Sequence, residues 1–74
     1  MKQGKQRYEI MAIFFDEDGE YEGKRVGEKK KYLELAIREA HRVVDLDRIG
    51  ARVEAKVTLL GKVAHSFTYV RMGA

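Results

Sequence analysis

One stretch of the chain has the period of an α-helix: Leu33-Glu34-Leu35-Ala36-Ile37-Arg38-Glu39-Ala40-His41-Arg42-Val43-Val44. Its apolar residues recur every three or four positions, which places them along one side of a helix. This apolar stripe consists of Leu33, Ala36, Ile37, Ala40, Val43 and Val44. The change of period predicts a helix from about Glu28 to Leu46, with charged residues on its opposite side.

The segments that flank this helix have the period of β-strands. After it, residues 51–59 alternate apolar and polar without a fault, Gly61-Lys62 predicts a tight turn, and residues 63–72 predict a last strand. Before it, residues 8–15 are apolar on both sides of the strand from Ile10 onward, which indicates a central strand that is covered on both sides, or covered on one side and shielded by a partner on the other. Asp-Gly within residues 16–19 predicts a hairpin turn, and residues 20–26 a weak return strand at a sheet edge.

The order of elements is therefore ββαββ. We expect a basic N-terminal tail at residues 1–7 and a single α+β domain at residues 8–74, with an antiparallel sheet and one helix packed on one face. The core is expected to combine the helix stripe with both central strands. Its predicted members are Leu33, Ile37, Ala40, Val44, Ile10 or Ile13, Val53 and Val57.

Length and composition restrict the classes of protein that fit. The chain has 74 residues, 45% of them hydrophobic, with no Cys or Pro and a net charge of +3. Such a length allows one domain and no large buried active site. No apolar run is long enough for a membrane span or a secretory signal, so we expect a cytoplasmic protein without membrane contact. The lack of Asn beside abundant charge is seen in heat-adapted proteins.

Catalytic and metal-binding signatures are not supported by the residues. In Asp16-Glu17-Asp18-Gly19, a calcium loop aligned on Gly19 would place Arg25 where a bidentate glutamate is required. The chain has two His and no Cys, so a zinc site would need carboxylates to complete it. We therefore expect a binding protein rather than an enzyme, with no cofactor and no metal.

A basic run before the helix is the first candidate surface. Its cations are Lys24, Arg25, Lys29, Lys30 and Lys31. Lysines in the first helical turn would gather beside backbone N–H groups that attract anions, which favours contact with phosphates. The alternative is an ordinary solvated charge run, partly neutralised by the acidic residues 16–22.

The last hairpin offers a second candidate surface that depends on register. A two-residue type II′ turn at Gly61-Lys62 would place Phe67 and Tyr69 on the solvent side, where aromatic rings and cations suit single-stranded RNA or DNA. That surface would comprise Arg52, Lys56, His65, Phe67, Tyr69 and Arg71. A three-residue loop, residues 60–62, would instead turn both aromatics inward, opposite Ala55 and Val53. Turn chemistry favours the first register and hydrophobic burial favours the second.

Two functions follow as hypotheses. The first is binding of single-stranded nucleic acid through the basic run and the aromatic sheet face. The second is a protein-interaction or self-associating accessory module, a regulator or subunit of a larger complex. One helix covers only one face of a sheet, and residues 10–15 are apolar on both sides. We therefore expect the chain to be at least a dimer.

Overall fold

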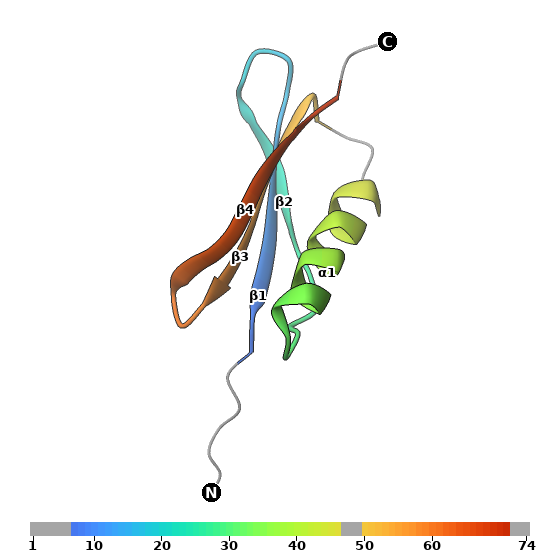
Figure 1. Cartoon of the computed structure of the whole chain (residues 1–74). Helices are drawn as coiled ribbons and strands as arrows, with labels where there is room; N and C mark the ends of the chain where they lie inside the picture. Colours follow the sequence, from blue (N-terminus) through green and yellow to red (C-terminus); the bar gives the residue numbers. More distant parts are fainter. Residues whose placement is uncertain (1–6, 47–49, 72–74) are drawn as a thin grey trace, which may run out of the picture.

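A computed structural model describes residues 7–46 and 50–71, which form four strands and one helix in the order ββαββ (Figure 1). The elements are β1 (Glu9–Phe15), β2 (Tyr21–Val26), α1 (Leu33–Leu46), β3 (Arg52–Leu59) and β4 (Lys62–Val70). The predicted α+β class and element order are confirmed. The basic tail expected at residues 1–7 lies, apart from Arg7, outside the described residues.

All four strands belong to one antiparallel sheet with the order β2-β1-β3-β4. The two hairpins lie side by side, and the first strand of each is central. α1 contacts β1 and β3 and lies along one face of the sheet (Figure 1). The most apolar strand, β1, is one of the two central strands and has a strand on each side. The charged β2 forms an edge of the sheet, where unpaired charge is tolerated.

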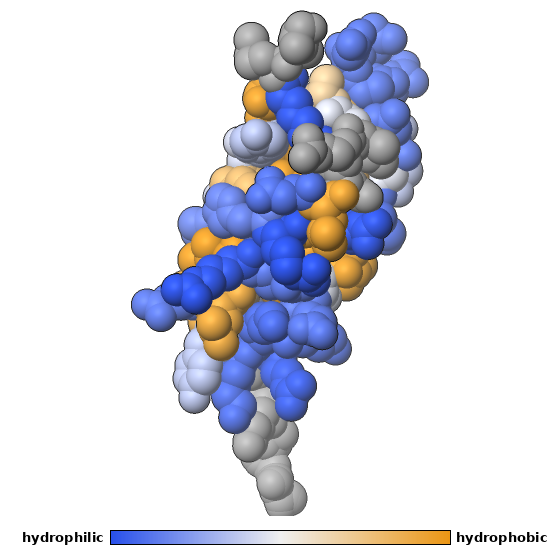
Figure 2. All heavy atoms as spheres, turned by 90° about the vertical axis from the view of Figure 1, so that its right-hand side faces the viewer, coloured by the Kyte–Doolittle hydropathy of each residue, from blue (hydrophilic) through white to orange (hydrophobic). Residues whose placement is uncertain are grey.

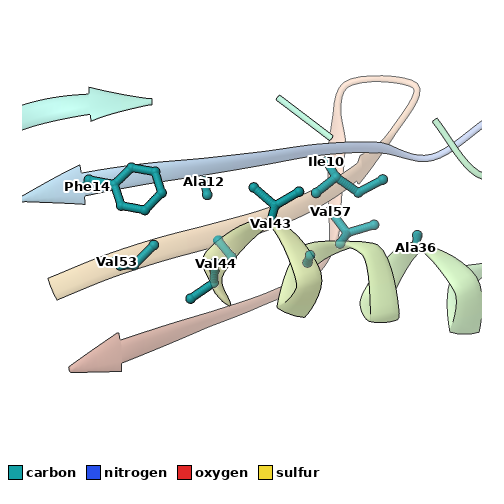
Figure 3. Packing of buried hydrophobic residues seen from close by; sticks show 10 residues of the cluster. Ile10, Ala12, Phe14, Ala36, Val43, Val44, Val53 and Val57 are labelled. Atoms are coloured by element: carbon teal, nitrogen blue, oxygen red, sulfur yellow. The ribbon is translucent and has the colours of Figure 1, made fainter. Parts of the chain in front are cut away.

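The core lies between α1 and the two central strands. Alternate residues of β1 and β3 point toward the helix, which presents small side chains and valines to them (Figure 3). Alanines at two successive turns of α1 let the helix approach the sheet closely. The buried members are Ile10, Ala12, Phe14, Ala36, Ala40, Val43, Val44, Val53, Ala55 and Val57.

The predicted start of the helix was wrong, because α1 begins at Leu33 and not near Glu28. The chain before it stays extended and continues beside β1. The N–H of Gly27 donates to the carbonyl of Ile10 at 3.0 Å, and Tyr8 and Lys30 exchange backbone hydrogen bonds of 2.7 and 3.1 Å. Sheet pairing satisfies these backbone groups as well as a helical turn would. The lysines of the basic run therefore precede the helix.

The stripe that faces the sheet also differs in part from the prediction. Ala40 and Val44 are buried as expected, but Leu33 is 36% exposed and Ile37 is half-buried. Ala36 and Val43, two other residues of the apolar stripe, take their place in the core. Of the two alternatives on β1, Ile10 is in the core and Ile13 faces away from the helix.

The turn between β3 and β4 combines features of both registers considered from the sequence. The turn predicted at Gly61-Lys62 was wrong by one residue: Leu60 and Gly61 form a two-residue turn with φ of 52° and 79°, as in type I′ rather than type II′ turns. Between the pairs Thr58–Val63 and Val57–His65 the register shifts, which leaves Ala64 as the extra residue of a β-bulge. Beyond the bulge, Phe67 lies opposite Ala55 and Tyr69 opposite Val53, as in the inward register.

Two isoleucines of β1 give a matched test of this placement. Ile10 is 1% exposed and faces α1, whereas Ile13 is half-buried on the other face. Ile10→Ala is expected to lower the free energy of unfolding by about 2–5 kcal/mol, because it leaves a cavity in the core. Ile13→Ala is expected to cost clearly less. Urea unfolding of both variants measures the difference, and equal losses would contradict the assignment of faces.

Candidate functional site

The face of the sheet that points away from α1 is not covered by any described element, and we call it the open face. Met11, Ile13 and Phe15 form an apolar stripe along β1 on this face, since they alternate with buried residues. Three exposed apolar side chains flank the stripe at paired positions. Val26 lies beside Met11, Tyr21 beside Phe15, and Val70 beside Arg52. The side on which α1 lies is largely hydrophilic, with apolar side chains in separate patches (Figure 2).

Charged side chains of β2 and β3 border the apolar stripe. Lys24 and Glu54 lie beside Ile13, and Lys56 lies beside Met11. The guanidinium carbon of Arg52 lies 4.5 Å from the centre of the Phe15 ring, which is a cation–π contact. The Nη2 atom of Arg52 is also 3.6 Å from Glu54 Oε2.

Arg52 also carries an unsatisfied donor. Its Nε is shielded from solvent and has no hydrogen-bond partner among the described residues. Buried donors without an acceptor are rare in folded proteins and costly, because the group has lost its hydration without replacement. The open face therefore holds a polar group that lacks an acceptor.

The residues predicted for a nucleic-acid surface are divided between the two sides of the sheet. Arg52 and Lys56 lie on the open face, whereas His65, Phe67 and Tyr69 of β4 lie on the helix side. Phe67 packs against the core, and its ring stacks on His41 with centroids 4.3 Å apart and planes inclined by 8°. His65 lies 6.0 Å from the same ring.

Tyr69 and Arg71 lie at the other end of β4, also on the helix side. Tyr69 is 47% exposed, and the guanidinium of Arg71 is 5.7 Å from its ring. Arg71 donates to the carbonyl oxygen of Val44 at 2.6 Å and to that of Gly50 at 3.3 Å. The last turn of α1 thereby gains a donor for a carbonyl that has no partner within the helix.

The basic run is spread along β2 and the connection to α1. Lys24 lies on the open face, and Arg25 pairs with Ala12, on the helix side. Lys29 Nζ is 3.7 Å from Glu9 Oε2, and Lys30 Nζ is 3.1 Å from Glu28 Oε1. Lys31 is exposed.

We call the end of the sheet where β1 begins the basic end. Its cations include Lys29, Lys30, Lys31 and Lys56, of which Lys29 and Lys30 pair with Glu9 and Glu28. Two of these, Lys29 and Lys56, border a groove of about 260 Å³ whose floor includes Met11 and Val26.

The connection is fixed to α1 by a buried carboxylate that the sequence did not single out. Glu39 is 4% exposed and accepts hydrogen bonds from the Glu28 N–H at 2.8 Å and from Arg42 Nε and Nη2 at 2.8 and 2.7 Å. The hydrogen bonds from Arg42 lower the pKa of Glu39 to about 2, against the opposing effect of burial. Gly27 packs so closely here that a Cβ would lie 2.9 Å from Glu39 Cγ. The spacing Glu39-x-x-Arg42 is the only sequence signal of this contact.

The opposite end of the sheet is acidic, and we call residues 16–22 the acidic tip. Five of these seven residues are Asp or Glu. Asp16 Oδ1 accepts from the N–H groups of Asp18 and Glu20, each at 2.9 Å, and Gly19 has φ of 83°. Tip residues line a hollow of about 540 Å³ together with Gly50, Ala51 and Arg71. The acidic tip directly follows the apolar stripe at Phe15, and the basic end lies at the other end of that stripe.

Within the described ranges, 7–46 and 50–71, no group of three or more His, Cys, Asp or Glu side chains is placed to hold a metal ion. The helix described there is too short and too polar to cross a membrane. No protein-family model, curated protein or solved structure matches this chain. The function is therefore argued from the geometry of the open face and of the two charged ends.

The buried carboxylate makes a pH-dependent contribution to stability. The pKa of Glu39 falls from 4.5 to about 2 on folding, so its stabilisation is complete above the unfolded pKa and is lost as the pH falls toward 2. Glu39→Gln is expected to lower the free energy of unfolding at about pH 7, and this deficit is expected to shrink as the pH approaches about 2. Urea unfolding of both proteins across this range measures it. A deficit independent of pH would contradict the role of the ionised carboxylate.

Proposed function

We propose that the protein is a binding module rather than an enzyme, and that it acts by contact of its open face with another protein chain. The observation that carries the proposal is the apolar stripe Met11, Ile13 and Phe15 along a central strand, on the face that no described element covers. Burying such a stripe against a partner removes apolar surface from water, which favours association.

The composition of the open face supports a protein partner. Met, Phe, Tyr and Arg are enriched in the centres of protein interfaces, and the face holds Met11 together with the adjacent Phe15, Tyr21 and Arg52. Charged side chains border this centre, as at the rim of an interface.

The charges disfavour stacking of nucleic-acid bases on the same face. Its two aromatic side chains, Phe15 and Tyr21, immediately flank the carboxylates of the acidic tip. A strand whose bases stacked there would bring its phosphates close to those carboxylates, and like charges repel. The cations at the basic end adjoin the aliphatic part of the stripe instead.

Nucleic-acid binding is the second candidate function, and the basic end favours it. Lys29 and Lys56 border one groove, and Lys31 is exposed close by in the chain. Clustered lysines bind phosphates through charge and release counterions when they do so. This mode contacts the backbone of single-stranded RNA or DNA and does not read its sequence.

Two tyrosines with the same exposure test the leading proposal. Tyr21 on the open face and Tyr32 just before α1 are each 63% exposed. Each is replaced in turn by the photoreactive benzoylphenylalanine, and cells that make the protein are irradiated. The variant at position 21 is expected to crosslink to a protein chain at least several-fold more than the variant at position 32, because the open face is buried in the contact. Equal crosslinking at both positions would contradict the proposal.

A titration of short single-stranded oligonucleotides tests the second candidate. Backbone binding is expected to weaken steeply as salt rises. Neutralising Lys29 and Lys31 to Gln is expected to reduce the slope of log K against log salt by about 1.4, at about 0.7 for each phosphate that is no longer neutralised. Arg38→Gln, an exposed cation of α1, serves as the control and is expected to leave the slope unchanged. Absence of binding at low salt would exclude this candidate.

A further inference from the structure

The open face fits a second copy of the same chain. Resting on the proposed function, we infer that two copies pack their open faces together around a two-fold axis that lies between the sheets and runs across the strands. The strands of the two copies are then antiparallel, and each acidic tip lies over the basic end of the other copy.

A dimer interface of standard size would take up a modest share of the molecular surface. A standard interface buries about 800 Å² on each partner, about 15% of the 5354 Å² surface of this chain. The open face extends over all four strands. Two sheets that pack face to face keep their strand directions within about 30° of each other, so the twisted apolar stripes remain in contact near the axis.

The apolar stripe is self-complementary under this symmetry. Ile13 is the middle residue of the stripe and lies near the axis, against Ile13 of the second copy. Met11 then faces Phe15 of the second copy, and Phe15 faces Met11. A two-fold contact repeats each pair, as an isologous interface requires.

Charge at the two ends of the stripe favours this orientation over the other face-to-face arrangement, although beside the stripe it places Arg52 over Lys56 of the second copy. The acidic tip follows the stripe at Phe15, and Lys29 and Lys56 lie beside its first residues, so the two charged ends are separated along the strand direction. An axis that runs across the strands places the acidic tip of each copy over the basic end of the other copy. An axis parallel to the strands would place the two acidic tips together and the two basic ends together, which is repulsive.

Sedimentation of the purified chain tests the dimer. The expected mass at high micromolar concentration is twice 8.5 kDa. Ile13→Glu is expected to return it to 8.5 kDa, whereas Leu35→Glu, at an exposed position of α1, leaves the dimer intact. Raising salt from about 0.05 M to about 0.5 M is expected to weaken the dimer several-fold, because screening removes the attraction between the ends. A monomer at all concentrations up to millimolar, or a dimer that salt strengthens, would overturn the inference.

Single cysteines test the orientation, and the chain has no cysteine of its own. Facing strands of packed sheets lie about 10 Å apart, within reach of a short bis-maleimide. Ile13→Cys is expected to link to itself in nearly full yield. Met11→Cys is expected not to, because four residues of offset add about 13 Å along the strand. Equal linking of both variants would overturn the antiparallel orientation. A folded Ile13→Cys chain that does not link would overturn the two-fold contact.

The two proposals fail in different ways. A monomer whose position 21 still crosslinks to a different protein overturns the second copy as occupant and leaves the proposed function standing. A chain that crosslinks to no protein at position 21 and stays monomeric overturns both. A dimer with the expected links supports both.

Discussion

A single helix covers one face of two strands, and the rest of the structure follows from that limit. α1 has 14 residues and contacts β1 and β3, so the fully buried side chains of the sheet all come from the facing sides of these two strands. The helix makes its main contacts with β1 and β3 and not with the edge strands β2 and β4. The open face has no second layer among the described residues. The molecule is therefore well packed in its centre and asymmetric in its surfaces.

The coarse fold was predictable because it depends on periodicity. The alternation of residues 51–59 and the stripe of residues 33–44 each bury one side of an element, and any other local structure would break the pattern. The start of the helix was not predictable in the same way. Residues 28–32 are mostly charged, and a polar segment satisfies its backbone equally by a helical turn or by pairing with Tyr8. Their structure depends on a strand that is distant in sequence.

The candidate surface was predicted less well, because Ala64, which has no partner on β3, determines which face of the sheet the aromatic residues of β4 lie on. The turn has two residues but lies at Leu60-Gly61 instead of Gly61-Lys62, and the bulge at Ala64 then sets the register that turns Phe67 inward. The sequence did not indicate this combination of a shifted turn with a bulge. Phe15 was expected in a strand covered on both sides, or covered on one side and shielded by a partner on the other, and the position of α1 shows which face of the strand the described helix covers. Glu39 was missed because its partner Glu28 contributes a backbone N–H, which no side-chain pattern reveals.

The contact between Arg52 and Phe15 has a consequence for the behaviour of the free chain in solution. The guanidinium lies over the ring, so polar atoms cover this end of the apolar stripe. The Phe15 ring is thus partly shielded from water in the free chain, and rotation of one long side chain would uncover it for a partner of the kind proposed.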